Sequence, residues 1–182
     1  EHVAGVRGFP RQTTMLAGRL KAEGPYGWHA ENPDLRSRIE EGIHLHRWNA
    51  AQYDEAAMAK ASRSLAAFLR QGLVTPPRDK HALTPIETAG KKVFDSDETR
   101  CATCHTPAQD FTDRTPHILV WPTAAGFDEE PPGSGFKPPS LLFVQGTAPY
   151  YHDGSVATLE DLIANNQDRM GKTSHLSTEE RA

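Results

Sequence analysis

The chain has 182 residues, including 14 Gly and 14 Pro, and a formal net charge of -4 at pH 7. That length suits one medium domain or two small ones. The charge offers no basic stripe for nucleic acid, and no apolar run approaches the roughly 18 residues that span a membrane. We therefore expect a turn-rich globular chain with neither a nucleic-acid partner nor a membrane span. Because it opens with Glu1 and no leader, we expect a processed or trimmed product.

Two helices are predicted in the first part of the chain. Asp34 caps the first, and Leu35, Ile39 and Ile43 form its buried stripe. Asp54 caps the second, which ends at Gly72. The apolar face of this second helix contains Met58, Ala61, Leu65, Phe68 and Leu69.

A second unit is predicted to begin after a linker at residues 76–83, which contains consecutive prolines. Thr84 is placed to cap a helix that runs to about Phe94, with Pro85 in its first turn and Glu87 closing a capping box. Near the other end of the chain, Ser177 and Glu180 form a similar helix start.

The remainder of the chain shows no convincing strand alternation, and residues 123–135 are a Gly- and Pro-rich loop. The predicted fold is therefore all-α with long loops.

The segment from Arg100 to His105 contains the C-x-x-C-H pattern of covalent haem attachment. Thiols one helical turn apart, here Cys101 and Cys104, can add to two vinyl groups on one porphyrin edge, which leaves His105 to ligate the iron. A structural zinc site would need a second pair of ligands, and a thioredoxin-like pair would need a βαβ setting. The motif therefore predicts haem c, with His105 as the proximal ligand.

Two further residues are expected at this haem. Metal-bound His105 needs an acceptor for its Nδ1–H, and the carbonyl of Pro138 or Pro139 is the candidate, with Pro139 preferred. Met170 lies in a polar loop with little packing reason for a methionine, so it is the candidate distal ligand. The alternatives for that ligand are His117, His152 and His175.

Three motifs in residues 84–182 resemble, in order, the C-terminal domain of bacterial dihaem cytochrome c peroxidases and MauG-like proteins. They are the segments 136–141 (F-K-P-P-S-L), 147–155 (T-A-P-Y-Y-H-D-G-S) and 158–162 (T-L-E-D-L). The resemblance implies a cytochrome c-like fold, an electron-accepting haem with Met170 as axial ligand, and a second, peroxidatic haem in an N-terminal domain. It also implies a small cytochrome or cupredoxin as redox partner. Because thioether formation is catalysed outside the cytoplasm in bacteria, we expect a periplasmic or otherwise extracytoplasmic protein.

An internal repeat links the two parts of the chain. Pro25-Tyr26, Leu35 and Ile39 match Pro149-Tyr150, Leu159 and Ile163 at an offset of 124 residues (149 minus 25). Residues 1–75 are thus interpreted as a partial cytochrome c-like repeat without an attachment motif, and residues 84–182 as the haem-bearing repeat. We expect the chain to be a piece of a longer polypeptide, with an attachment segment before Glu1 and a helix after Ala182.

The repeat places His46 at the position equivalent to Met170. His46, or else His44, could therefore be the ligand of a first-repeat haem. The simpler alternative is that His46 continues the buried stripe of its helix as a core histidine.

The first repeat also bears on catalysis. Trp28 resembles the Trp of the family's F-W-D-G-R motif, which relays electrons between haems, although core packing would equally explain an aromatic there. The rest of that motif differs, and Ala17 replaces an Asn that binds an interdomain calcium in the family. The carbonyls of Thr147 and Pro149 alone make a weak calcium site. The sequence thus leaves two hypotheses: part of a peroxidase-like or MauG-like oxidoreductase, or a non-catalytic monohaem electron carrier.

Overall fold

The computed structural model describes residues 8–46, 54–75, 81–120, 122 and 126–181, and these residues are mostly helical. The helices are α1 (Leu35–Leu45), α2 (Glu55–Ala67), α3 (Pro85–Asp95), α4 (Cys101–Cys104), α5 (Leu159–Asn165) and α6 (Thr178–Arg181). Short turns of helix are η1 (Arg19–Lys21), η3 (Phe68–Gly72), η4 (Pro107–Gln109) and η5 (Val144–Gly146). Two-residue strands β1 (His117–Ile118) and β2 (Gly135–Phe136) pair antiparallel and make the one sheet in this part of the chain. The all-α prediction is confirmed.

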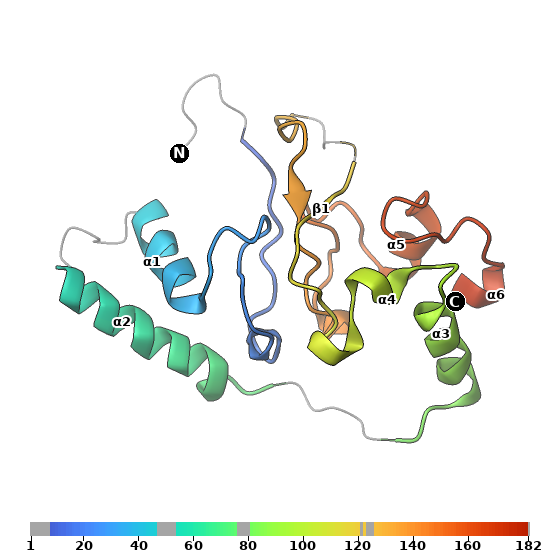
Figure 1. The fold of residues 1–182 in the computed structure, drawn as a ribbon, viewed down its shortest axis with the longest axis horizontal. Coiled ribbons are helices and arrows are strands. Elements are labelled where there is room, and N and C mark those ends of the chain that lie inside the picture. The colour runs from blue at the N-terminus through green and yellow to red at the C-terminus, as the bar shows by residue number, and fades with distance from the viewer. Residues whose placement is uncertain (1–7, 47–53, 76–80, 121, 123–125, 182) are drawn as a thin grey trace.

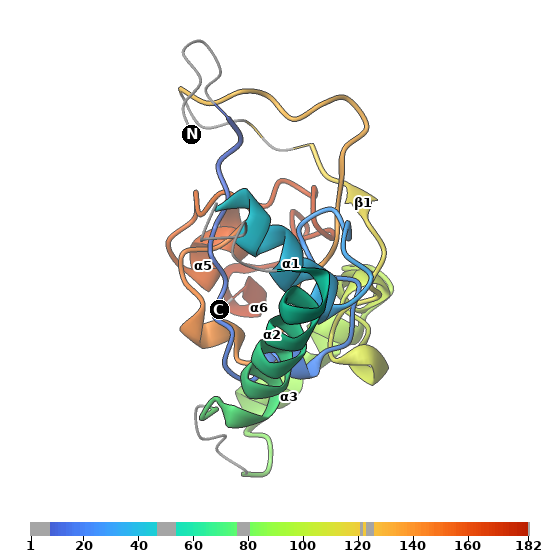
Figure 2. The same ribbon diagram turned by 90° about the vertical axis from the view of Figure 1, so that its left-hand side faces the viewer.

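The helices α1 and α2 pack together at one end of the molecule (Figure 1, left; α2 faces the viewer in Figure 2). Both predicted caps are present, since the Asp34 carboxylate accepts from Ser37 N at 2.8 Å and the Asp54 carboxylate from Ala57 N at 2.7 Å. Leu35 and Met58 are buried. The rest of the predicted apolar face is not: Leu65 is 41% exposed and Phe68 54%.

The start of α3 matches its predicted capping box. Thr84 Oγ1 accepts from Glu87 N at 3.3 Å, and the Glu87 carboxylate accepts from Thr84 N at 2.8 Å. The Ser177 and Glu180 pair forms the same reciprocal hydrogen bonds at the start of α6.

Removing the cap of α3 tests this local structure. We expect Thr84→Ala to lower the free energy of unfolding by about 1 kcal/mol, because it leaves first-turn N–H groups without their acceptor. Thr88→Ala, a change of the same size on the exposed surface of α3, is the control. Urea denaturation followed by circular dichroism should separate the two variants. Equal stability would show that the capping box contributes nothing.

Local geometry recurs at the offset found in the sequence. Tyr26 bridges Asn32 and Tyr150 bridges Val156, which are pairs separated by 124 residues (150 minus 26). Two residues after each bridge, Asp34 or Thr158 caps the next helix, α1 or α5. This recurrence supports the proposal of two related units.

The N-terminal segment runs through the middle of the molecule beside the C-terminal unit (Figure 1). Gln12 N donates to the His152 carbonyl at 2.6 Å, and Lys137 N donates to the Trp28 carbonyl at 2.8 Å. Backbone hydrogen bonds therefore join the two units around residues 136–152. Among the described residues, no helix has the length and apolar character needed to cross a membrane.

Candidate functional site

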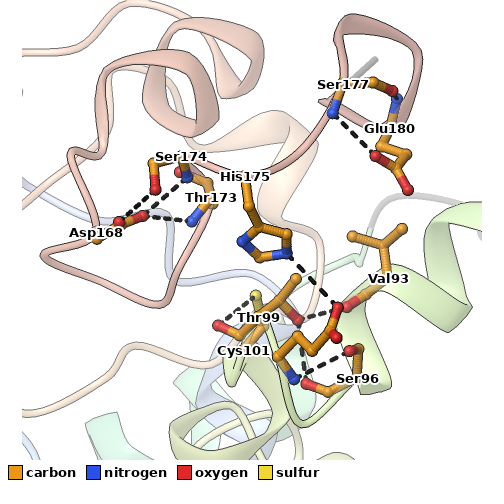
Figure 3. Close-up of polar contacts among 11 residues, drawn as sticks. Val93, Ser96, Thr99, Cys101, Asp168, Thr173, Ser174, His175, Ser177 and Glu180 are labelled. Atoms are coloured by element: carbon orange, nitrogen blue, oxygen red, sulfur yellow. Dashed lines mark hydrogen bonds and ion pairs between the residues drawn. The ribbon is translucent and has the colours of Figure 1, made fainter.

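The attachment motif forms a single helical turn, α4, directly after α3. Cys101 and Cys104 are both partly buried free thiols. Thr99, only 1% exposed, donates from its hydroxyl to the Val93 carbonyl at 2.5 Å (Figure 3). Arg100 N donates to the Ser96 carbonyl at 3.0 Å. These bonds hold α4 against the end of α3, and the hydrogen bond from His105 N to the Cys101 carbonyl at 3.0 Å closes the turn that spaces the two thiols.

His105 follows α4 and is 8% exposed. Its Nδ1 lies 3.0 Å from the carbonyl oxygen of Phe111, so that nitrogen can donate and leave Nε2 for a metal. Burial lowers the pKa of His105, with a smaller opposing effect from the Phe111 carbonyl. The ring is thus held as a neutral imidazole, the form that ligates iron.

The predicted prolyl partner of this ring is joined by a stronger one. The Pro139 carbonyl does act on the His105 ring as a backbone hydrogen-bond acceptor, with a smaller effect on its pKa than the Phe111 carbonyl. The Pro138 carbonyl accepts from Thr112 Oγ1 at 2.7 Å. No local pattern indicated Phe111, whose backbone reaches His105 through a left-handed conformation with φ of 60°.

The loop that carries Met170 lies against the attachment turn. Lys172 N donates to the Thr99 carbonyl at 2.8 Å. A Cβ at Gly171 (φ 85°) would lie 2.9 Å from Thr99 O and 3.5 Å from Cys101 Sγ, so only glycine fits there without a shift. Met170 itself is partly buried against the cluster of Tyr150, Tyr151 and Val156. The structure thus brings the Met170 loop and Cys101 together.

Asn166 fixes this loop, and the sequence analysis did not identify it. Its side chain is 1% exposed; Oδ1 accepts from Met170 N at 2.7 Å, and Nδ2 donates to the Gly171 carbonyl at 2.6 Å. The Asp168 carboxylate stabilises the same loop by accepting from Thr173 N at 2.7 Å and from Ser174 N at 2.8 Å (Figure 3). Asn is common in turns, so the sequence alone does not show that this Asn is buried and bonded to the Met170 loop.

Each of the three histidines considered as alternative distal ligands contacts another side chain in the structure. His117 Nε2 is 2.5 Å from the Asp113 carboxylate, and both lie with Cys104 in a group whose ligand atoms are within 4.8 Å of one another. His152 is buried and stacks on Phe136 at 4.2 Å. His175 Nε2 is 3.9 Å from the Glu98 carboxylate.

The candidate ligands of the first repeat, His44 and His46, belong to no group of three potential metal ligands among the described residues. His46 ends α1 and is exposed, as is His44, so the prediction of a core histidine at His46 is wrong. Trp28 is half-buried, with its ring edge-on to His152 at 6.5 Å and 76°. The packing contact expected of Trp28 is therefore present.

The donor set of the second unit fits a c-type haem. Two thiols stand one turn apart, a neutral buried imidazole follows them, and a thioether loop lies against the first thiol. These are the ligand types that hold haem c.

Comparisons with known proteins agree with this fit. No protein-family model matches the chain. Over 128 residues it is 31% identical to the cytochrome c551 peroxidase of Nitrosomonas europaea, an alignment that covers 60% of this chain and 37% of the relative. The chain thus spans little more than a third of that curated protein.

Two solved structures share the fold. Hydrazine synthase of Kuenenia stuttgartiensis matches with a TM-score of 0.62 and 21% identity, over 94% of this chain and 69% of the other. A MauG-like protein associated with microbial copper homeostasis matches with a TM-score of 0.64 and 19% identity, over 94% and 70%. The cytochrome c-like fold is therefore confirmed. In sequence the chain is distantly similar to a cytochrome c peroxidase.

Proposed function

We propose that this chain is a haem c electron-transfer protein and forms the electron-accepting part of a dihaem peroxidase-like or MauG-like oxidoreductase. The observation that carries the proposal is the packing of the Met170 loop on the C-x-x-C-H turn, with the Gly171 Cβ position 3.5 Å from Cys101 Sγ. Met170 also packs on the cluster of Tyr150, Tyr151 and Val156, and the neighbouring Gly171 brings its loop against the attachment turn.

Each residue then has a distinct task. When bound, the haem supplies one-electron chemistry; Cys101 and Cys104 fix it to the chain. His105 presents Nε2 while Phe111 orients its ring. Met170 would offer its thioether as the second iron ligand, which would raise the reduction potential and suit the site to outer-sphere electron transfer rather than peroxide binding.

A peroxidase activity would belong to a second haem in the first repeat. Trp28 is proposed as the relay between the two haems, supported by its ring contact with His152 of the second unit. His46, the C-cap of α1, is proposed as an axial ligand of that haem because the repeat places it at the position of Met170. A second C-x-x-C-H motif encoded before Glu1 would support this arrangement.

The alternative function is a non-catalytic monohaem electron carrier or a redox subunit. In both cases the proposed partner is a small cytochrome or cupredoxin, or another part of the same polypeptide, and the proposed location is the periplasm. Rapid mixing of the reduced, haem-loaded product of the complete gene with peroxide separates the two: turnover supports the dihaem enzyme, and slow oxidation without turnover supports the carrier.

Covalent attachment tests what both functions share. Produced in a periplasm with haem maturation factors, the chain should keep its haem colour on denaturing electrophoresis, while the double change Cys101→Ala and Cys104→Ala should abolish it. Thr103→Ala, at an exposed position between the cysteines, is the control and should retain the colour. Colour that separates from the wild-type chain on denaturation would overturn the proposal.

A further inference from the structure

Two cationic side chains near His105, Arg19 and Lys137, form no ion pair with a carboxylate among the described residues. Arg19 of η1 is partly buried and donates from its guanidinium to the Ser140 carbonyl. Lys137 is also partly buried; its ammonium forms no hydrogen bond or ion pair within the described residues, and Asp113 and Glu31 act on it only through longer-range electrostatics. A third cation, Arg114, pairs at 3.2 Å with the exposed Glu23, but its buried Nε has no partner.

Hydrogen bonds fix the segments that carry these cations around the haem-ligand turn. Ser140 Oγ donates to the Asp110 carbonyl at 2.6 Å, and Thr112 Oγ1 donates to the Pro138 carbonyl at 2.7 Å. The bonded stretch 110–112 includes Phe111, which orients His105. Arg19 and Lys137 are therefore held beside the turn that presents the iron ligand.

Their electrostatic environment is unfavourable as it stands. Burial is the main cause that lowers the pKa of both Arg19 and Lys137. The charge of Arg19 lowers the pKa of Lys137 further, and Asp113 and Glu31 offset this lowering only in part. Arg19 also lowers the pKa of His105. Cations withdrawn from water are costly unless an anion pairs with them. A ligand with negative charge is thus expected at this position.

We infer that Arg19 and Lys137 bind the carboxylates of the haem that Cys101, Cys104 and His105 hold. The haem is the dianion that the neighbouring ligand turn would bring to this place, and guanidinium and ammonium groups are the usual partners of carboxylates. The inference rests on the proposed haem function. It also makes the first unit part of the haem site of the second, because Arg19 comes from the N-terminal segment and reaches Ser140.

The test uses charge-removing and charge-keeping variants of the holoprotein. Arg19→Gln and Lys137→Gln should keep covalent haem but shift the reduction potential to more negative values. The oxidised haem carries one more positive charge than the reduced haem, so removing a nearby cation favours the oxidised form. The propionate bending band in resonance Raman spectra should shift with it. Arg19→Lys and Lys137→Arg should restore most of both readouts. Lys21→Gln, an exposed change of the same charge in η1, is the control and should leave both near wild type.

The outcomes are distinguishable. Wild-type protein without covalent haem would refute the proposed function itself. Haem-loaded Gln variants with unchanged potential and propionate band would overturn this inference alone, as would equal shifts in the charge-keeping variants. A shift that appears only when inorganic phosphate is added would assign the cations to a free anion and also overturn it. If Arg19→Gln does not accumulate, Lys137→Gln and Lys137→Arg decide the question.

Discussion

Replacement of Met170 by His is expected to lower the reduction potential of the haem by about 0.1–0.3 V, within the ~0.8 V range that axial ligands span. A thioether favours the reduced iron, whereas a second imidazole favours the oxidised iron. Spectroelectrochemical titration measures the shift. The weak near-infrared sulfur-to-iron band of the oxidised protein should disappear in the same variant.

His175→Ala is the matched control for this change, because His175 lies on the same stretch of chain after Met170. It should leave the potential and the near-infrared band unchanged. If Met170→Ala instead kept the wild-type spectrum, the distal ligand would have to be His117, His152 or His175.

Asn166→Ala is expected to destabilise the holoprotein by about 2–4 kcal/mol. The change leaves the Met170 N–H and the Gly171 carbonyl without the side-chain partners they have now, and each buried group left unsatisfied costs about 1–3 kcal/mol. Urea denaturation measures this loss. Because the same bonds hold the loop of the distal ligand, the sulfur-to-iron band should weaken as well.

Asn166→Asp keeps the acceptor for Met170 N but loses the donor to Gly171, so an intermediate effect is expected. Asn165→Ala, at the exposed neighbouring position, is the control. Similar losses of unfolding free energy in the Asn165 and Asn166 variants would show that the Asn166 hydrogen bonds to the Met170 loop have no special role.

Local signals in the sequence predicted the helix starts correctly. A cap acts on a backbone N–H three residues ahead, so Asp34, Asp54, Thr84 and Ser177 carry their information within one turn. The attachment turn is equally local, because thiol spacing and the adjacent His are set by covalent chemistry.

Contacts between distant segments were not predictable in the same way. A prolyl carbonyl could be predicted as an acceptor for His105, but no local pattern indicated that the chain folds Phe111 back onto the ring. Asn166 looked like any turn residue until its buried bonds to the Met170 loop were seen. The apolar stripe of α2 predicted which face could be buried, but not that Leu65 and Phe68 would lie exposed in this chain.

The most direct test of the central claim is the intact mass of the denatured chain, combined with a pyridine haemochrome assay. We expect the mass of the polypeptide plus one haem, and a haemochrome band of the type given by two thioether bonds. Two bonds follow from the two free cysteines, Cys101 and Cys104, placed one turn apart ahead of His105. The bare polypeptide mass from protein matured in a periplasm with haem maturation factors would contradict the account.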